Sequence, residues 1–193
     1  NLTPQLEARF RERFEPLCGA GAVVSLHSGM TPAQRLTSWL AAHTGTARIV
    51  LGTRMAVFAS LPGLRLIVVD EEHDPSYKSQ EGARYSARDL AVYRAKVETE
   101  ALAASGAELE STSDARCQVI LGSATPSLES WHAAEQGRYQ RLAMPARIGG
   151  GAMPRLRLVD MNHQPKGALI APPLLAAMLE RIARGEQSLV LLN

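Results

Sequence analysis

Four consecutive polar residues, Asp70–His73, directly follow an apolar run and could carry chemistry. A carboxylate at the end of a buried strand can hold Mg²⁺ directly or through water, and a second carboxylate can orient the water that attacks a γ-phosphate. Asp70, Glu71 and His73 are therefore candidate catalytic residues. Asp70 and Glu71 are also candidates for nucleotide binding, and His73 for coupling nucleotide state to its neighbours. The competing interpretation is an exposed acidic turn that happens to follow a strand.

A second polar group, Ser123–Pro126, also follows an apolar run. The small hydroxyl side chains of Ser123 and Thr125 can hydrogen-bond the acidic group if the two strand ends are adjacent. The alternative is ordinary helix capping, because Ser or Thr before Pro commonly starts a helix.

The elements that must position these groups alternate between helix and strand. Strands that are apolar throughout, separated by helices, predict an α/β fold with a parallel sheet covered on both faces. Ligands in such folds bind beyond the carboxyl ends of the strands, where both polar groups are expected. We expect strands at residues 22–26, 48–51, 64–69 and 118–121. Helices are expected to start at Pro4, at Pro32 after a Thr31 cap, near Ser86 and after Pro126, with Leu90, Tyr93, Val97 and Ala101 on one face of the third.

The remainder of the chain predicts a change of domain. Residues 105–114 are small and polar, which predicts a loop. The glycine-rich residues 147–155 predict a linker between a first domain over 1–146 and the start of a second over 156–193. The second part is expected to contain a strand at 156–159, a helix at 172–184 and a last strand at 188–192.

Composition limits the function only weakly. The 193 residues have a net charge of +2, too small to argue for nucleic acid by itself. Cys18 and Cys117 are far apart, so neither a disulfide framework nor a zinc site is expected, and a reducing cytosol is the natural compartment. No run approaches the roughly 18 apolar residues of a membrane span. Because the sequence starts without Met, we expect an internal or trimmed piece of a longer protein.

The order of the motifs resembles superfamily 2 DNA helicases. The acidic run followed by Gly122–Thr125 is similar to motifs II and III of the DExH group, Gly52–Arg54 to motif Ib, and Leu2–Gln5 to the end of motif Ia. The resemblance is closest to the primosomal replication-restart helicases and spans nearly the whole chain. It is carried by His27–Pro32, by the run Asp70–Asp89, by Leu158–Met161 and by Gly185–Asn193.

The resemblance implies a fold, a cofactor and residue roles. The fold would be an incomplete RecA-like first motor lobe, lacking the strand of the phosphate-binding loop, followed by the start of the second lobe. Mg-ATP would be the cofactor, with Asp70 on the Mg²⁺ and Glu71 activating water. The coupling residues would be His73, Ser123 and Thr125, and the DNA-binding residues would be Thr53, Arg54, Tyr77, Lys78, Arg84, Tyr85 and Arg88.

Physical chemistry is consistent with the implied DNA contacts. Tyrosine rings stack on bases, while lysine and arginine meet phosphates. The alternatives are core or loop packing for Tyr77 and Tyr85, and a surface ion pair for Arg54.

The sequence also departs from the family pattern. No Gly-x-x-x-x-Gly-Lys-Ser/Thr loop occurs, and Gly19–Gly21 is too short for one, so it predicts a turn. The arginine finger and the zinc-binding cysteines of the family match nothing in this chain. Residues 97–116 exceed the family's usual connection and predict a surface insertion without an assigned role.

We therefore expect part of an ATP-dependent 3′-to-5′ DNA helicase that restarts replication at stalled forks in bacterial cytoplasm, near the nucleoid. Its expected partners are single-stranded and forked DNA, other primosome proteins and single-stranded DNA-binding protein, with no membrane. The isolated chain is expected to be inactive as an ATPase. The alternatives are another superfamily 2 translocase, a truncated chain that only binds DNA, and a metal hydrolase that would need further ligands.

Overall fold

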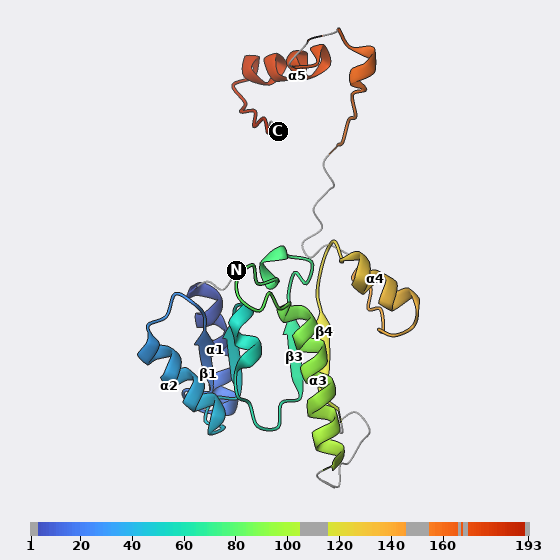
Figure 1. The fold of residues 1–193 in the computed structure, drawn as a ribbon. Helices are drawn as coiled ribbons and strands as arrows, with labels where there is room; N and C mark the ends of the chain where they lie inside the picture. Colours follow the sequence, from blue (N-terminus) through green and yellow to red (C-terminus); the bar gives the residue numbers. More distant parts are fainter. Residues whose placement is uncertain (1–3, 105–115, 146–154, 166, 168–169, 192–193) are drawn as a thin grey trace. The chain divides into compact units, whose positions relative to one another are not determined.

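The computed structural model describes residues 4–104, 116–145, 155–165, 167 and 170–191 (Figure 1). Contacts between residues divide the chain into two compact units, Asn1–Arg141 and Leu142–Asn193. The predicted loop at 105–114 and most of the predicted linker at 147–155 lie outside the described residues. The proposed division at residues 146 and 156 therefore stays a prediction.

Four short parallel strands form the centre of the first unit. β1 (Val23–Leu26) pairs with β2 (Ile49–Gly52), and β3 (Leu66–Val69) pairs with β4 (Gln118–Leu121). The parallel α/β class predicted from the sequence is confirmed. The single continuous sheet is not formed by the described residues, because no backbone hydrogen-bond ladder joins β2 to β3.

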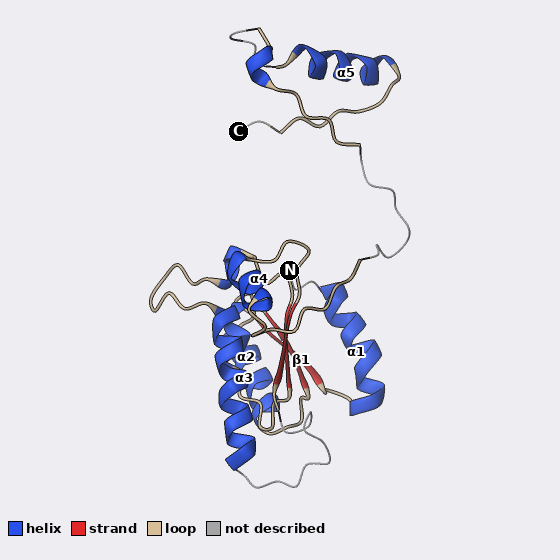
Figure 2. Cartoon of the chain, turned by 90° about the vertical axis from the view of Figure 1, so that its right-hand side faces the viewer, coloured by secondary structure: helices blue, strands red, loops and turns tan. Residues whose placement is uncertain are grey.

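Helices cover the two strand pairs differently. α1 (Pro4–Cys18) lies on one side of the strands, and α2 (Pro32–His43) and α3 (Ala87–Ala104) lie on the other (Figure 2). α1 and α2 both contact β1, whereas α3 contacts β3 and β4. Successive side chains of a strand point to opposite faces. The face of β3 and β4 that carries Leu66, Val68 and Ile120 is consequently exposed.

The helix starts follow local sequence signals, with one correction. The Thr31 hydroxyl accepts from the Gln34 backbone N–H, and the Gln34 side chain accepts from the Thr31 N–H, so the predicted cap is a capping box. α4 (Leu128–Glu135) begins later than predicted, because Ser127 rather than the residue before Pro126 is its N-cap.

The buried face of α3 is not the face that carries its large apolar residues. Tyr93 and Val97 are exposed, and the buried residues are Ala87, Ala91 and Ala95. These alanines recur every four residues and therefore share one face of the helix. Their small side chains let α3 approach β3 and β4 closely, which an argument based only on large apolar residues misses.

Gly52 is required by the close approach of two backbone segments. A Cβ atom at this position would lie 2.2 Å from the Ala56 Cβ and 2.5 Å from the Leu26 carbonyl oxygen. No side chain fits there, so glycine allows β2 to turn directly into the 3₁₀ helix η1 (Arg54–Phe58). This turn carries the Gly-Thr-Arg motif.

The second unit contains a short 3₁₀ helix, η3 (Met161–His163), and α5 (Pro172–Ala183). α5 confirms the helix predicted at 172–184. The predicted strands are wrong for the described residues 156–159 and 188–191, which form no strand. A strand needs the backbone donors and acceptors of a neighbour, and the described part of this unit offers none.

Candidate functional site

The acidic turn Asp70–His73 begins where β3 ends. The backbone ladder with β4 continues past both strands, because the Gly122 N–H donates to the Val69 carbonyl at 2.8 Å and the Glu72 N–H donates to the Gly122 carbonyl at 3.0 Å. These bonds hold the acidic turn beside the start of the Ser123–Thr125 segment, called the hydroxyl segment below. The two polar groups therefore leave neighbouring strands at the same edge, as predicted.

Glu71 has an unusual backbone conformation within this turn. Its φ is +48°, in the left-handed region that non-glycine residues seldom adopt. Such strain persists only where surrounding contacts impose it, and it concentrates at functional sites. The Asp74 N–H donates to the Glu71 carbonyl at 2.8 Å and closes the turn.

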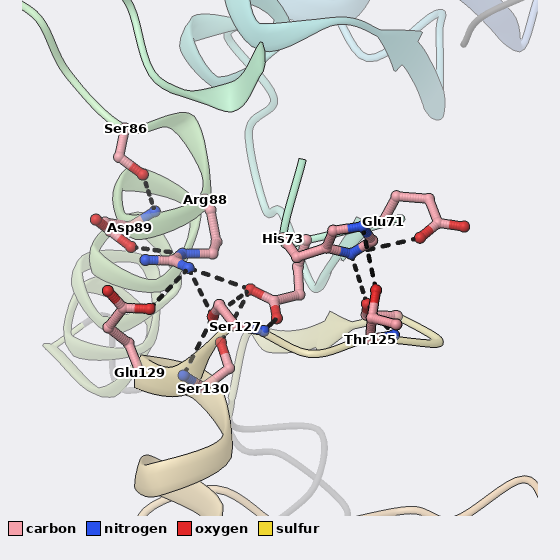
Figure 3. A network of polar contacts seen from close by, with 11 residues as sticks. Glu71, His73, Ser86, Arg88, Asp89, Thr125, Ser127, Glu129 and Ser130 are labelled. Carbon is pink, nitrogen blue, oxygen red and sulfur yellow. Dashed lines mark hydrogen bonds and ion pairs between the residues drawn. The ribbon is translucent and has the colours of Figure 1, made fainter. Parts of the chain in front are cut away.

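His73 joins the acidic turn to both hydroxyl residues. Its Nδ1 lies 2.7 Å from the Ser123 Oγ, and its Nε2 lies 3.3 Å from the Thr125 Oγ1. The Glu71 carboxylate lies 3.5 Å from the same Nδ1 (Figure 3). A hydroxyl can donate or accept, so this arrangement suits either neutral tautomer of the imidazole. The three residues expected to couple ATP hydrolysis to strand movement are in direct contact, and that role stays a prediction.

Glu72 faces away from this group and is buried, with 3% of its surface exposed. Its Oε1 accepts from the Ser127 backbone N–H at 2.7 Å. Its Oε2 accepts from the Ser127 hydroxyl at 3.0 Å, the Ser130 hydroxyl at 3.0 Å and the Arg88 Nη1 at 3.2 Å. Both oxygens of this buried carboxylate therefore have donors, one at Oε1 and three at Oε2.

The charge of Glu72 is stabilised by these donors. Burial alone would raise the pKa of Glu72, but the hydrogen bonds from the Ser127 backbone, the two serine hydroxyls and Arg88 together lower it below the ordinary value of 4.5. Arg88 also donates from Nε to Asp89 at 2.8 Å and from Nη1 to the Ser127 hydroxyl at 2.9 Å. Figure 3 shows this group beside the cluster of His73 and Thr125.

Tyr77 attaches the loop after the acidic turn to that turn, and Arg54 attaches the same loop to the Gly-Thr-Arg motif. The Tyr77 hydroxyl donates to the Asp70 carbonyl at 2.8 Å. The Arg54 Nη1 donates to the carbonyls of Ser76 and Lys78 at 3.1 and 3.0 Å. Burial, followed by the nearby carboxylates, raises the pKa of Tyr77. The Gly-Thr-Arg motif is thus connected to the acidic turn through this loop.

The chain is similar over its whole length to known replication proteins. The chain is 38% identical over 192 residues to the replication restart protein PriA of Haemophilus influenzae and 38% identical over 192 residues to that of Treponema pallidum. It is 35% identical over 196 residues to PriA of Bacillus subtilis. Each match covers the whole chain. The chain belongs to the PriA family.

The chain spans 22–26% of the length of these three PriA proteins, so it corresponds to about a quarter of such a protein. No protein-family model matches the chain.

The predicted DNA-binding residues of this PriA-family chain lie in different surroundings. Thr53, Lys78 and Arg84 are exposed, and Arg84 has a φ of +48°. The Tyr85 ring packs edge-on against Phe58, with ring centroids 5.0 Å apart. Arg88 is held in the group around Glu72. The DNA-binding roles stay predictions, and for Tyr85 the structure adds a packing contact.

Sequence reasoning missed Glu72, Ser127 and Ser130 as a connected set. Glu72 was part of the acidic run without a role of its own. The available signal was Ser127, a preferred N-cap residue directly before an amphipathic stretch. Nothing in the sequence indicates that Glu72 and Ser130, 58 residues apart, meet.

Two further observations concern metals and membranes. Among the described residues, no three His, Cys, Asp or Glu side chains gather as a metal-binding group. In the same part of the chain, none of the helices combines the length and apolar character that a membrane span requires.

Proposed function

We propose that this PriA-family chain is part of the motor of an ATP-dependent 3′-to-5′ DNA helicase that acts in replication restart. One observation carries the proposal: the Asp70–His73 turn and the Ser123–Thr125 segment meet at the carboxyl ends of two paired parallel strands. That edge is where open α/β folds bind ligands. The related proteins are named replication restart protein PriA, which supports the replication-restart setting.

Asp70 is the residue that would hold the Mg²⁺ of Mg-ATP. Mg²⁺ in nucleotide sites takes only one or two carboxylates and fills its remaining positions with phosphate oxygens and water. A single exposed aspartate at a strand end fits that requirement, and its Oδ1 is engaged only locally, by the Glu71 N–H at 3.1 Å. When bound, Mg²⁺ neutralises charge that develops on the phosphates.

Glu71 would orient the attacking water, and His73 would report the state of the site. The Glu71 side chain is 59% exposed, and His73 is its one ion-pair neighbour among the described residues. Its carboxylate is therefore available as a general base. His73 contacts Ser123 and Thr125 on the other strand end, so a change at Glu71 reaches that segment through one side chain.

The experiment uses the full-length protein that contains this chain. ATP turnover would be measured with and without single-stranded DNA, and unwinding would be compared on forked duplexes with 3′ and 5′ tails. We expect DNA-stimulated turnover that Asp70→Asn abolishes and that Glu100→Gln, a change to an exposed carboxylate on α3, leaves intact. Wild-type protein without DNA-stimulated turnover, or equal turnover in Asp70→Asn, would contradict the proposal.

The isolated chain is expected to hydrolyse no ATP, because its sequence contains no glycine-lysine loop to hold the β- and γ-phosphates. Measurable turnover by the purified chain would overturn that expectation.

A further inference from the structure

Glu72 has no part in the proposed reaction, although it lies between two residues that do. Its carboxylate is buried, and it accepts hydrogen bonds from four donors of two other helical segments. A buried charge with this many partners is costly to disturb. These hydrogen bonds attach the acidic turn to the start of α3 and to the N-cap of α4.

The contacts attach the hydroxyl segment at both of its ends. Ser123 and Thr125 contact His73, and two residues later Ser127 contacts Glu72 through its backbone and its hydroxyl. His73 and Glu72 are consecutive. The segment from Ser123 to Ser127 is therefore bound at both ends to neighbouring residues of the acidic turn.

Arg88 connects the same carboxylate to the start of α3. Its Nη1 donates to both the Glu72 Oε2 and the Ser127 Oγ, so one nitrogen bridges the acidic turn and the N-cap of α4. The Ser127 hydroxyl uses its full capacity: it donates to Glu72 and accepts from Arg88 and from the Ser130 N–H. α3 directly follows the loop of Tyr77 and Tyr85, so this loop is anchored at its far end by Arg88.

We infer that Glu72, Arg88, Ser127 and Ser130 form a clamp that positions the Ser123–Thr125 segment on His73 and links it to the start of α3. These are positioning residues, since they act through His73. The clamp has one structural consequence, which is that it restrains residues 122–127. It also has a kinetic consequence, which is that it affects how DNA bound near the loop changes ATP turnover. Only the kinetic consequence rests on the proposed function.

The test uses the full-length protein and four variants: Arg88→Met, Ser130→Ala, the combination of both, and Lys96→Met as the control. Lys96 lies on α3, eight residues beyond Arg88, in an exposed ion pair with Glu100. Hydrogen exchange of residues 122–127 is measured without nucleotide or DNA. Turnover is then measured at saturating ATP with and without saturating single-stranded DNA, together with the KM for ATP.

We expect each single variant to speed exchange of residues 122–127 by about 10-fold and to lower the ratio of DNA-stimulated to unstimulated turnover by about 5-fold, with the KM for ATP changed less than about 2-fold. The combined variant should resemble the stronger single variant, because both changes act on one carboxylate. A direct DNA contact by Arg88 would instead make the two effects on turnover independent and additive.

Unchanged hydrogen exchange of residues 122–127 in both single variants would overturn the clamp. If DNA stimulates the wild-type protein, additive effects of Arg88→Met and Ser130→Ala on the turnover ratio would also overturn it. If Arg88→Met fails to fold, Arg88→Lys replaces it, since lysine keeps the charge but cannot bridge two acceptors with the arginine geometry. If the wild-type protein hydrolyses no ATP, the proposed function fails, and the exchange measurement still decides the clamp.

Discussion

Glu71 and Glu72 are adjacent carboxylates in opposite surroundings. The Glu71 side chain is 59% exposed and lies near one imidazole, whereas Glu72 is buried and accepts four hydrogen bonds. A carboxylate with free acceptor positions can take a proton or orient water. One that is buried among four donors has little access to water and instead holds neighbouring segments together. Within two residues, the turn thus places one carboxylate that is open to solvent beside one that is buried and hydrogen-bonded.

The largest expected effect tests the open carboxylate. Glu71→Gln in the full-length protein should lower ATP hydrolysis by about 10²- to 10⁴-fold, because an amide cannot accept the proton of the attacking water. ATP binding should be retained, since the amide keeps the size of the side chain. Turnover and nucleotide affinity are measured in parallel, with Glu100→Gln as the matched control. Wild-type turnover in Glu71→Gln would remove this residue from the chemistry.

The second effect tests the buried carboxylate. Glu72→Ala leaves its donors without their acceptor, which should lower the local free energy of opening by about 1–3 kcal/mol. Hydrogen exchange in α4 of the full-length protein measures this change. Faster exchange there, with no comparable change in the distant β1, would confirm a local structural role. Exchange equal to that of the wild-type protein would show that the four contacts contribute nothing to the folded state.

A smaller effect is expected at Tyr77. Tyr77→Phe removes only the hydrogen bond to the Asp70 carbonyl and should cost about 0.5–1.5 kcal/mol of local stability. Faster exchange at the Asp70–Asp74 amides is the expected result. The packing contact between Phe58 and Tyr85 serves as an internal reference, because the variant leaves it untouched.

The smallest effect is the response to acid. The pKa of Glu72 is lower in the folded protein than its ordinary value of 4.5, so its charge stabilises the fold above that pH and the contribution is lost as the pH falls through the lowered pKa. Protection of α4, corrected for intrinsic exchange rates, should therefore decline below about pH 4.5 in the wild-type protein. Glu72→Gln should lack the loss of α4 protection that comes from protonation of Glu72. Identical pH profiles of the wild-type protein and Glu72→Gln would argue against a contribution of the Glu72 charge to stability.

Short-range signals predicted much of this fold. Thr31 before Pro32 has the residue types of a helix start, and the apolar run ending at Val69 identified the strand that carries the acidic turn. The shared strand edge followed from general rules for parallel sheets, so the meeting of His73 with Ser123 could be anticipated.

Other features depend on pairings that no local pattern encodes. The predicted strand at 156–159 has the right residues but lacks a neighbour among the described residues, and strand formation depends on that neighbour. The alanine face of α3 and the convergence of Glu72 with Ser130 are set by tertiary packing. Residues far apart in the sequence meet there, and their spacing carries no signal.

The left-handed backbone of Glu71 has a consequence for mutagenesis of this site. A survey of all amino acids at position 71 would rank them on two scales at once: their acid–base chemistry, and their tolerance of a φ of +48°. Valine and isoleucine would fail through branching at Cβ, and glycine or asparagine would fold easily while lacking the carboxylate. Loss of activity becomes interpretable only when each substitution is compared with another of equal conformational tolerance.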